Sequence, residues 1–474
     1  MKLVNKIIYV VTLATIIALG YLITRLNILP NKYYIPIIIL LVIWAVILFF
    51  IGVKSKKKVL NIIAVILMVI SIGINCFGSY YVYNTNRLFS SISEAVEKKV
   101  YYVVVKKNST YNKLTDLDGK TMALFDTEST NYNKALAQVN KSIKVTSKKY
   151  EDMNTIVKDV LDGTVDSVLI NSSNKEILDE AITDFKDNTK VIKKITISVK
   201  KASSNNKINS EGNFNILVSG IDTYGDINTV SRSDVNIVLT INSKNHELVM
   251  TSVPRDMQVQ LHGTTGLKDK LTHAGIYGID MSRTTLEDFL ETDIDYYIRV
   301  NFDSVVQLVD AIGGIDINND VAFSGRTRYF NTGTIHLNGK QALEYSRERY
   351  KMPSGDWTRG LHQEEVIRAV FTKIATSTEL LTNYSEIITS LESFFQTNIP
   401  SELIKKYVKD QLDNMTSWEV NSYAVGGSGY DYQETYSMPG IKLYVTLPNE
   451  EHRLHTSKVI NSVLNGKKYK DISW

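Results

Sequence analysis

The sequence predicts an α/β protein with three N-terminal transmembrane helices, a small α/β accessory domain and a larger α/β/α domain with a mixed central sheet. Long uncharged apolar runs fill the N-terminal part, and short strand-like and helix-like segments alternate after it. A polar stretch, 201–213, divides the alternating region and is expected to be a linker. We therefore expect spans within 1–83, the accessory domain within 84–200 and the larger domain within 214–474.

The transmembrane prediction depends on three apolar runs without a charged residue, Ile7–Ile23, Tyr33–Val53 and Val59–Asn86. About 20 apolar residues in a helix cross the hydrocarbon core of a bilayer. A cleaved signal peptide is the alternative for the first run alone. The second and third runs would still anchor the chain.

The placement of lysines predicts the orientation. Lys2 and Lys6 precede the first run, and the loop 54–58 between the second and third runs holds four lysines, whereas the first loop holds only Arg25 and Lys32. The positive-inside rule then puts the N-terminus in the cytoplasm and the chain after the third run outside a bacterial cell membrane. Because an outside domain has no supply of ATP, an activated group must reach it already attached to a carrier.

Composition excludes some classes of function. The formal net charge is +4, from 54 basic and 50 acidic side chains, and gives no support for a nucleic-acid partner. The single cysteine, Cys76, lies in the third apolar run, so no disulfide forms within the chain.

The accessory domain is predicted from strands that alternate with helices, after an amphipathic stem helix at 84–98. The expected strands are Val100–Val105, Lys120–Phe125, Val165–Ile170 and Ile195–Val199. The expected helices are Ala135–Val139, Met153–Leu161 and Glu176–Phe185. The pattern resembles one lobe of a periplasmic-type solute-binding fold. A ligand-binding role and a spacer or partner-docking role both remain open, and the second is favoured because no polar cluster marks a catalytic site.

The larger domain is predicted as a mixed sheet covered by helices on both faces. The expected strands are Phe214–Ser219, Asp234–Ile241, Leu248–Val253, Tyr296–Val300, Trp418–Val425 and Ile441–Leu447. The expected helices are Arg283–Leu290, Val305–Ile312, Gln341–Ser346, Glu364–Ile374, Glu402–Met415 and Glu450–Leu464.

Polar residues concentrate where three of these strands begin or end. Asp222 follows the first strand, and Arg255 follows the third together with Asp256. Arg232 and Asp234 lead into the second strand and share a face, because residues two apart in an extended chain point the same way. Strand ends are where ligand sites form in α/β sheets.

A further stretch adds more guanidinium groups. Arg347 and Arg349 share a face if the chain is extended there, and Arg359 and Gln363 share one if it is helical. Guanidinium groups bind phosphates in bidentate fashion and stay charged. Five arginines with two carboxylates suit a pyrophosphate bridged by a divalent cation. The alternative is that these residues form ordinary surface ion pairs, which contribute about 0–1 kcal/mol each.

At this point the sequence resembles a known family. The stretches ILVSGID, RSDVNIVLTIN, SVPRDM, DKLTHAGIYG, LNGKQALEYSRER and GDWTRGLHQEEVI look like the motifs of the LytR–CpsA–Psr family, in order over 214–375. The three spans and the extra domain resemble the members encoded in streptococcal capsule loci. The resemblance implies a membrane-anchored phosphotransferase that moves an undecaprenyl-pyrophosphate-linked glycopolymer, preferably capsular polysaccharide, onto peptidoglycan through a phosphodiester. It also implies a pyrophosphatase side activity.

The resemblance also implies roles for single residues. Asp222 and Asp234 would hold Mg²⁺ or Mn²⁺, and Asp234 and Arg255 would be the catalytic pair. Contacts to the pyrophosphate would come from Arg232, Arg255, Lys270, Arg347, Arg349, Arg359 and Gln363. His362 receives no role, since many relatives carry an arginine there, and the general base is left unassigned.

Two alternatives to the enzyme remain open: a non-catalytic membrane regulator, and a module that only binds the lipid-linked polymer. Other capsule-assembly proteins are possible partners.

Overall fold

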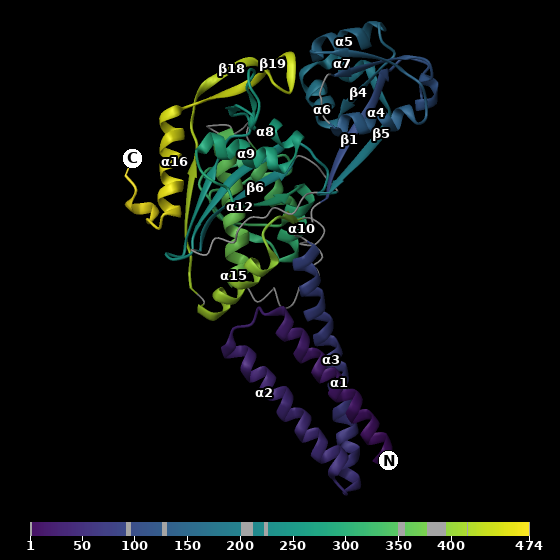
Figure 1. Ribbon diagram of the computed structural model, residues 1–474. Coiled ribbons are helices and arrows are strands. Elements are labelled where there is room, and N and C mark those ends of the chain that lie inside the picture. The colour runs from purple at the N-terminus through teal and green to yellow at the C-terminus, as the bar shows by residue number, and fades with distance from the viewer. Residues whose placement is uncertain are drawn as a thin grey trace. The chain divides into compact units, whose positions relative to one another are not determined.

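The computed structural model describes residues 2–91, 96–125, 130–200, 212–221, 226–348, 356–376, 395–414 and 416–473 (Figure 1). The chain forms two compact units. The first consists of Met1–Ser93 with Ile399–Ser417, and the second of Glu94–Asn398 with Trp418–Trp474.

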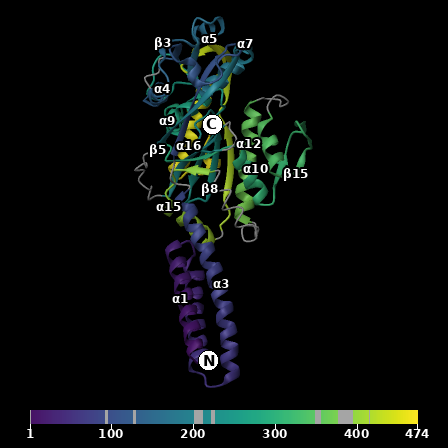
Figure 2. The same ribbon diagram turned by 90° about the vertical axis from the view of Figure 1, so that its right-hand side faces the viewer.

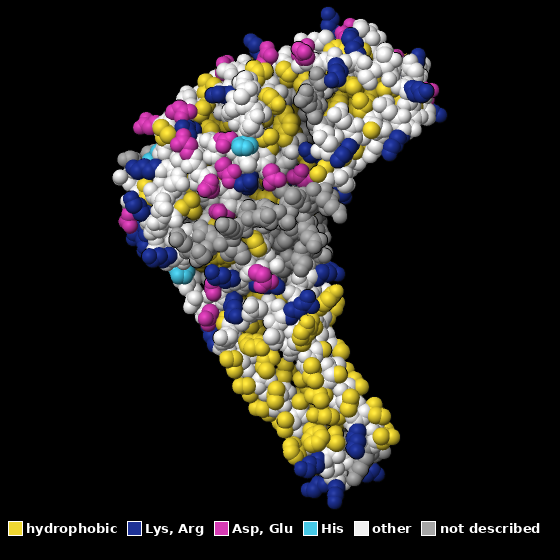
Figure 3. All heavy atoms as spheres, viewed as in Figure 1, with side chains coloured by type: hydrophobic (Ala, Val, Ile, Leu, Met, Phe, Trp, Pro, Cys, Tyr) yellow, Lys and Arg dark blue, Asp and Glu magenta, His cyan; other side chains and the backbone are white. Residues whose placement is uncertain are grey.

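The first unit contains three helices that are long and apolar enough to cross a membrane. They are α1 (Lys2–Leu26), α2 (Asn31–Leu48), which continues as the π-helical segment Phe49–Lys54, and α3 (Lys58–Ser91). Their surface is almost continuously hydrophobic (Figure 3). The prediction of three apolar spans is confirmed. The predicted stem helix at 84–98 is wrong in its second part, because α3 ends at Ser91 and a strand begins at Val96.

Helix α15 (Ser401–Asn414) also belongs to the first unit, although it comes from the C-terminal part of the chain. Lys409 Nζ donates a 3.0 Å hydrogen bond to Asn27 Oδ1, and Lys32 Nζ lies 3.5 Å from Asp413 Oδ1. These contacts hold α15 beside the connection between α1 and α2.

The accessory part of the second unit is a five-stranded mixed sheet in the order β3-β2-β4-β1-β5. Its strands are β1 (Val96–Lys106), β2 (Thr121–Phe125), β3 (Thr146–Tyr150), β4 (Ser167–Asn171) and β5 (Thr189–Lys200). Its helices are α4 (Thr130–Asn140), α5 (Met153–Asp162), α6 (Ser172–Ala181) and α7 (Thr183–Asn188). The single helix predicted at Glu176–Phe185 is wrong, since Ile182 has extended backbone and separates α6 from α7.

The larger domain has a six-stranded mixed sheet in the order β16-β11-β6-β7-β8-β17. Its strands are β6 (Asn213–Ile221), β7 (Ser233–Asn242), β8 (Glu247–Ser252), β11 (Tyr296–Val300), β16 (Phe395–Thr397) and β17 (Glu419–Ala424). Strands β6, β8 and β11 run in the same direction, and β7 runs opposite to its neighbours β6 and β8. The predicted mixed sheet is confirmed.

Helices cover both faces of this sheet (Figure 2). One face carries α9 (Ile279–Leu290) and α16 (Glu450–Leu464), and the other carries α10 (Phe302–Ala311), α11 (Gly339–Arg347) and α12 (Asp356–Thr376). Strand alternation explains the division. In β8, Val249 packs against Val459 of α16, while Ser252, which points to the opposite face, meets Gly360 of α12.

Several strands were not predicted, among them β3 and β16 of the two larger sheets. Others form short pairs: β9 (Gln258–Val259) with β10 (Asp269–Lys270), β12 (Ile315–Asn319) with β15 (Gly333–Leu337), and β13 (Phe323–Ser324) with β14 (Tyr329–Phe330). The predicted strand Ile441–Leu447 lies within β19 (Met438–Pro448), but it pairs with the unpredicted β18 (Gly427–Thr435) and not with the six-stranded sheet. Short helical segments α8 (Leu271–Ala274) and η3 (Gly275–Tyr277) follow β10.

Candidate active site

A cavity of about 430 Å³ opens at the edge of the six-stranded sheet where β6, β8 and β11 end and β7 begins. Carboxyl ends of strands that run in the same direction meet at one edge, which is the usual place of ligand sites in α/β sheets. The side chains of α11 and α12 close the other wall. The lining residues are Glu180, Gly220, Ile221, Arg232, Asp234, Val235, Arg255, Val300, Asn301, Phe302, Val305, Leu343, Ser346, Arg347, Arg359 and Gln363.

A β-bulge aims Asp234 into this cavity. In the pairing of β6 with β7, Gly220 lies opposite Val235 and Ile221 lies opposite Ser233, so Asp234 is the extra residue. Bulges redirect a side chain at the edge of a sheet. Gly220 permits the close approach, because a Cβ there would lie 2.6 Å from a methyl group of Val235.

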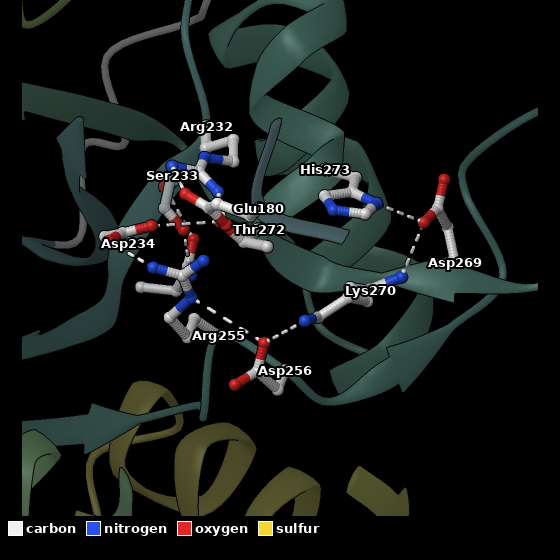
Figure 4. A network of polar contacts seen from close by, with 11 residues as sticks. Glu180, Arg232, Ser233, Asp234, Arg255, Asp256, Asp269, Lys270, Thr272 and His273 are labelled. Atoms are coloured by element: carbon white, nitrogen blue, oxygen red, sulfur yellow. Dashed lines mark hydrogen bonds and ion pairs between the residues drawn. The ribbon is translucent and has the colours of Figure 1, made fainter. Parts of the chain in front are cut away.

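Asp234 is the centre of a hydrogen-bond network (Figure 4). Its Oδ2 accepts from Nη1 of Arg255, and its Oδ1 accepts from the hydroxyl of Thr272 at 3.1 Å. Asp256 Oδ1 lies 3.7 Å from Nε of Arg255 and 2.5 Å from Nζ of Lys270. The carboxylates therefore hold Arg255 from two sides and fix its guanidinium at the cavity wall.

Arg232 is held by a different carboxylate. Its Nη1 and Nη2 donate to the two oxygens of Glu180 at 2.8 and 2.9 Å. The arginine is buried, with 5% of its surface exposed. Glu180 comes from α6 of the accessory domain, so that domain contributes directly to the cavity.

Helices α11 and α12 supply the remaining polar groups. Arg347 is the last residue of α11, and its guanidinium carbon lies 4.0 Å from the ring centre of Phe302. Arg359 and Gln363 are four apart on α12, so they lie on one helical face, and both line the cavity.

The structure brings together six of the residues that the sequence singled out: Arg232, Asp234, Arg255, Arg347, Arg359 and Gln363. Lys270 is not among the described lining residues and lies behind Arg255, against Asp256. Asp222 and Arg349 lie outside the described residues.

Sequence reasoning missed two lining residues that matter for the site, Glu180 and Phe302. Glu180 is an acidic residue near the end of a helix in another domain, and its role depends on how the accessory domain packs. Phe302 opens α10 two residues after the end of β11, and this position near a strand end was the available signal.

His362, which received no role, is a buried member of the aromatic core below the cavity. Its ring stacks on Tyr345 with 4.2 Å between centroids and on Phe323 with 5.3 Å. Burial lowers the pKa of its imidazole. We interpret His362 as a core residue that packs α12 against α11.

The residues present fit a divalent cation. Each carboxylate oxygen has two lone pairs, so Asp234 can keep its bonds to Arg255 and Thr272 and still offer an oxygen to a metal ion. Mg²⁺ is usually bound by one or two carboxylates together with substrate phosphates. Within the described part of the chain, no cluster of three or more His, Cys, Asp or Glu side chains suits a metal ion, which is compatible with such a sparse ligand set.

One side of the cavity is apolar. Its aliphatic and aromatic lining comes from β6, β7, β11, α10 and α11, namely Ile221, Val235, Val300, Phe302, Val305 and Leu343. Farther along α10, Leu308, Val309 and Ala311 belong to a hydrophobic core. The cavity therefore combines several guanidinium groups with an adjoining apolar wall.

Comparison with known proteins decides the family. A sequence model of the LytR_cpsA_psr family matches residues 181–447, more than half of the chain. The chain belongs to this family. The polyisoprenyl-teichoic acid–peptidoglycan teichoic acid transferase TagU of Bacillus cereus is 39% identical over 212 residues, 44% of this chain and 68% of that protein. The protein of the same name from Enterococcus faecalis is 37% identical over 206 residues, 43% of this chain and 67% of that protein.

A solved structure is also similar to this LytR_cpsA_psr protein. The crystal structure of Bacillus subtilis TagV shares 29% sequence identity and a TM-score of 0.45, covering 55% of this chain and 100% of TagV. The predicted family membership is confirmed by the match of the family model to residues 181–447.

Proposed function

We propose that this protein is a membrane-anchored phosphotransferase that moves a polyprenyl-pyrophosphate-linked glycopolymer onto peptidoglycan outside the cell. The observation that carries the proposal is the cavity in which Arg232, Arg255, Arg347 and Arg359 converge beside an apolar wall. Guanidinium groups neutralise a diphosphate, and apolar side chains suit the isoprenoid attached to it. The names of the two transferases described above support the same reaction.

In the proposed reaction, a hydroxyl of a peptidoglycan sugar attacks the polymer-side phosphorus. The new bond is the phosphodiester, and the bond to the bridging oxygen breaks, so the lipid leaves as a phosphate. Arg255, fixed by Asp234 and Asp256, is placed to stabilise the charge that develops during bond breaking. The hydroxyl proton passes to a base that stays unassigned, because Asp234 is already engaged by Arg255, by Thr272 and by the cation proposed below.

We also propose that the site uses Mg²⁺ or Mn²⁺, held by Asp234 and substrate phosphates. The cation would supply electrostatic stabilisation of the diphosphate. A slow pyrophosphatase reaction follows if water takes the place of the sugar hydroxyl. We favour capsular polysaccharide as the polymer, since the three spans and accessory domain resemble the capsule-locus members.

The test is transfer by the purified full-length protein, with Mg²⁺, lipid-linked glycopolymer and peptidoglycan fragments. Asp234→Asn and Arg255→Ala should each lower the transfer rate by about a hundredfold or more, as loss of a transition-state donor does elsewhere. Arg326→Ala, which removes an exposed arginine away from the cavity, is the matched control. Unchanged transfer by both site variants would refute the proposal.

Cells that carry Asp234→Asn test the alternatives and the polymer. We expect them to shed polymer into the medium while the protein stays in the membrane, and the shed polymer should be capsular polysaccharide. Unchanged attachment would favour the regulator. Loss of attachment without any change in the purified reaction would favour the binding module, and shed teichoic acid would replace capsule as the polymer.

A further inference from the structure

The accessory domain places one carboxylate inside the candidate active site. Glu180 of α6 accepts both terminal nitrogens of Arg232, in the two-point geometry by which a guanidinium also binds a phosphate (Figure 4). We propose that Glu180 competes with the diphosphate for Arg232 and thereby lowers the affinity of the site for its substrate. This inference rests on the proposed function.

Arg232 and Glu180 differ in how much free energy each loses when their ion pair separates. The side chain of Arg232 is 6% exposed and that of Glu180 is 62% exposed. A buried charge without a partner is costly, so Arg232 requires an anion at all times. Glu180 loses little by leaving, because its carboxylate is already largely hydrated and exposed ion pairs contribute about 0–1 kcal/mol. An arriving diphosphate can therefore replace it.

The position of Glu180 is unfavourable in its own helix. It is the penultimate residue of α6, which ends at Ala181. Carbonyl groups give a helix C-terminus partial negative charge, so a carboxylate there is destabilising unless a cation compensates. Arg232 is that cation, and the compensation at an exposed helix end is small, about 0.3–1 kcal/mol, so it does not prevent Glu180 from leaving.

The contact is part of a continuous interface between the accessory domain and the larger domain. Lys98 Nζ lies 2.5 Å from Asp226 Oδ2, and Lys99 Nζ donates to the carbonyl oxygen of Tyr277 at 3.1 Å. Two apolar residues of β19 complete the hydrophobic core of the accessory domain, Met438 and Ile441. Because these contacts anchor the accessory domain, Glu180 is held at the cavity.

The consequence is that the Glu180 carboxylate and the diphosphate bind in turn to the buried guanidinium of Arg232. Glu180 keeps Arg232 paired before the substrate arrives and again after the lipid phosphate leaves. The accessory domain thus weakens diphosphate binding and favours release of the phosphate product. Glu180 lies in α6 of the accessory domain, one residue before the segment that the family model matches.

The experiment measures pyrophosphate binding to the full-length protein in detergent, by calorimetry at constant Mg²⁺. Glu180→Gln should bind pyrophosphate about twofold to fivefold more tightly than the wild type, as expected for loss of a mostly exposed competitor. Glu151→Gln, an equal charge change at an exposed position of the same domain, should bind like the wild type. In an Arg232→Ala background, Glu180→Gln should have no further effect.

The outcomes separate this inference from the proposed function. Weaker binding by Glu180→Gln would show that Glu180 positions Arg232, and unchanged binding would show no competition. Either result overturns the inference while the diphosphate site stands. An increase that persists in the Arg232→Ala background would be a general charge effect and would also overturn it. Absence of pyrophosphate binding by the wild type would overturn both proposals.

Discussion

Glu364 is a carboxyl group buried in α12 beside the cavity-lining Gln363, with 1% of its surface exposed. Burial raises its pKa well above the ordinary value of 4.5, although the hydroxyl of Ser422 and the charge of Arg368 act in the opposite direction. The folded protein therefore keeps Glu364 protonated at pH values where the unfolded chain has lost that proton. Its contribution to stability is complete below about pH 4.5 and falls as the pH rises toward the folded pKa.

We expect Glu364→Gln to remove this pH-dependent loss of folding stability. Relative to the wild type, the variant should gain stability as the pH rises above 4.5, by up to about 1.4 kcal/mol per pH unit until the folded pKa is reached. The measurement is thermal unfolding of the full-length protein at pH values from about 4 to about 8. Glu365→Gln, its partly exposed neighbour, should show no such trend, and a pH-independent difference for Glu364→Gln would contradict the account.

Phe302 offers a second test at the scale of a residue. Its ring supports the guanidinium of Arg347 at 4.0 Å, a cation–π contact that also fixes the direction of the arginine. Phe302→Leu should weaken pyrophosphate binding by roughly twofold to tenfold, since such contacts contribute about 0.5–1 kcal/mol or more. Phe371→Leu, on a 40% exposed ring of α12, is the control in the same calorimetric assay. Affinity of Phe302→Leu equal to that of Phe371→Leu would show that the ring does not position Arg347 for binding.

The residues that the sequence identified share a local signal. Arg232 and Asp234 are two apart in a segment expected to be extended, and Arg359 and Gln363 repeat with the helical period, so each pair was expected on one side. Both pairs line the cavity, although a β-bulge directs Asp234. Glu180 had no such signal. It is 52 residues from Arg232 in the chain, and their contact follows from the packing of one domain on another.

At the scale of elements, Gly275 sets how closely the α8–η3 segment approaches the start of β7. A Cβ at this glycine would lie 2.6 Å from the carbonyl oxygen of Ser231 and 2.6 Å from the amide nitrogen of Ser233. Its backbone is right-handed helical, so alanine meets no conformational strain and the effect is steric. Since both contacts are to backbone, neither atom can rotate away, and the segment that carries Arg232 must move.

We expect Gly275→Ala to lower the free energy of unfolding by about 1–3 kcal/mol, the usual cost of overpacking. It should also weaken pyrophosphate binding, because Arg232 shifts. Thermal unfolding and calorimetry of the full-length protein measure the two effects. Gly73→Ala, where a Cβ would meet nothing within 4 Å, should leave both unchanged. Normal binding by a destabilised Gly275→Ala would separate the packing of this segment from the site.

The helices and strands that can be predicted from the sequence are those whose apolar residues recur with a clear helical or strand period. Most strands of the two larger sheets and most helices overlap the predicted ones, because apolar alternation or helical spacing marks them. Strand β18 lacks that signal, since Gly427 and Gly429 interrupt it and its tyrosines Tyr430 and Tyr432 point to solvent. It forms by pairing with β19, which no local pattern indicates. The break between α6 and α7 likewise depends on Phe185, which is buried in the accessory core.

At the scale of the whole molecule, α15 shows how distant segments combine. Lys32 and Asp413 are 381 positions apart, yet α15 lies with the membrane helices in one compact unit. No periodicity in the sequence predicts a contact of this range. The membrane helices themselves were predictable, because the bilayer imposes length and hydrophobicity on each of them. Their orientation is a prediction from lysine placement.

Cysteine labelling tests that orientation in a Cys76→Ser background, which removes the only native thiol. A membrane-impermeant maleimide should label Ser428→Cys, an exposed position in β18, on intact cells. It should label Ser55→Cys, in the lysine-rich loop between the second and third membrane helices, only after permeabilisation; this position keeps the loop's charges unaltered. The opposite pattern would place the arginine-lined cavity in the cytosol. Peptidoglycan would then be out of reach as the acceptor, whatever the cavity binds.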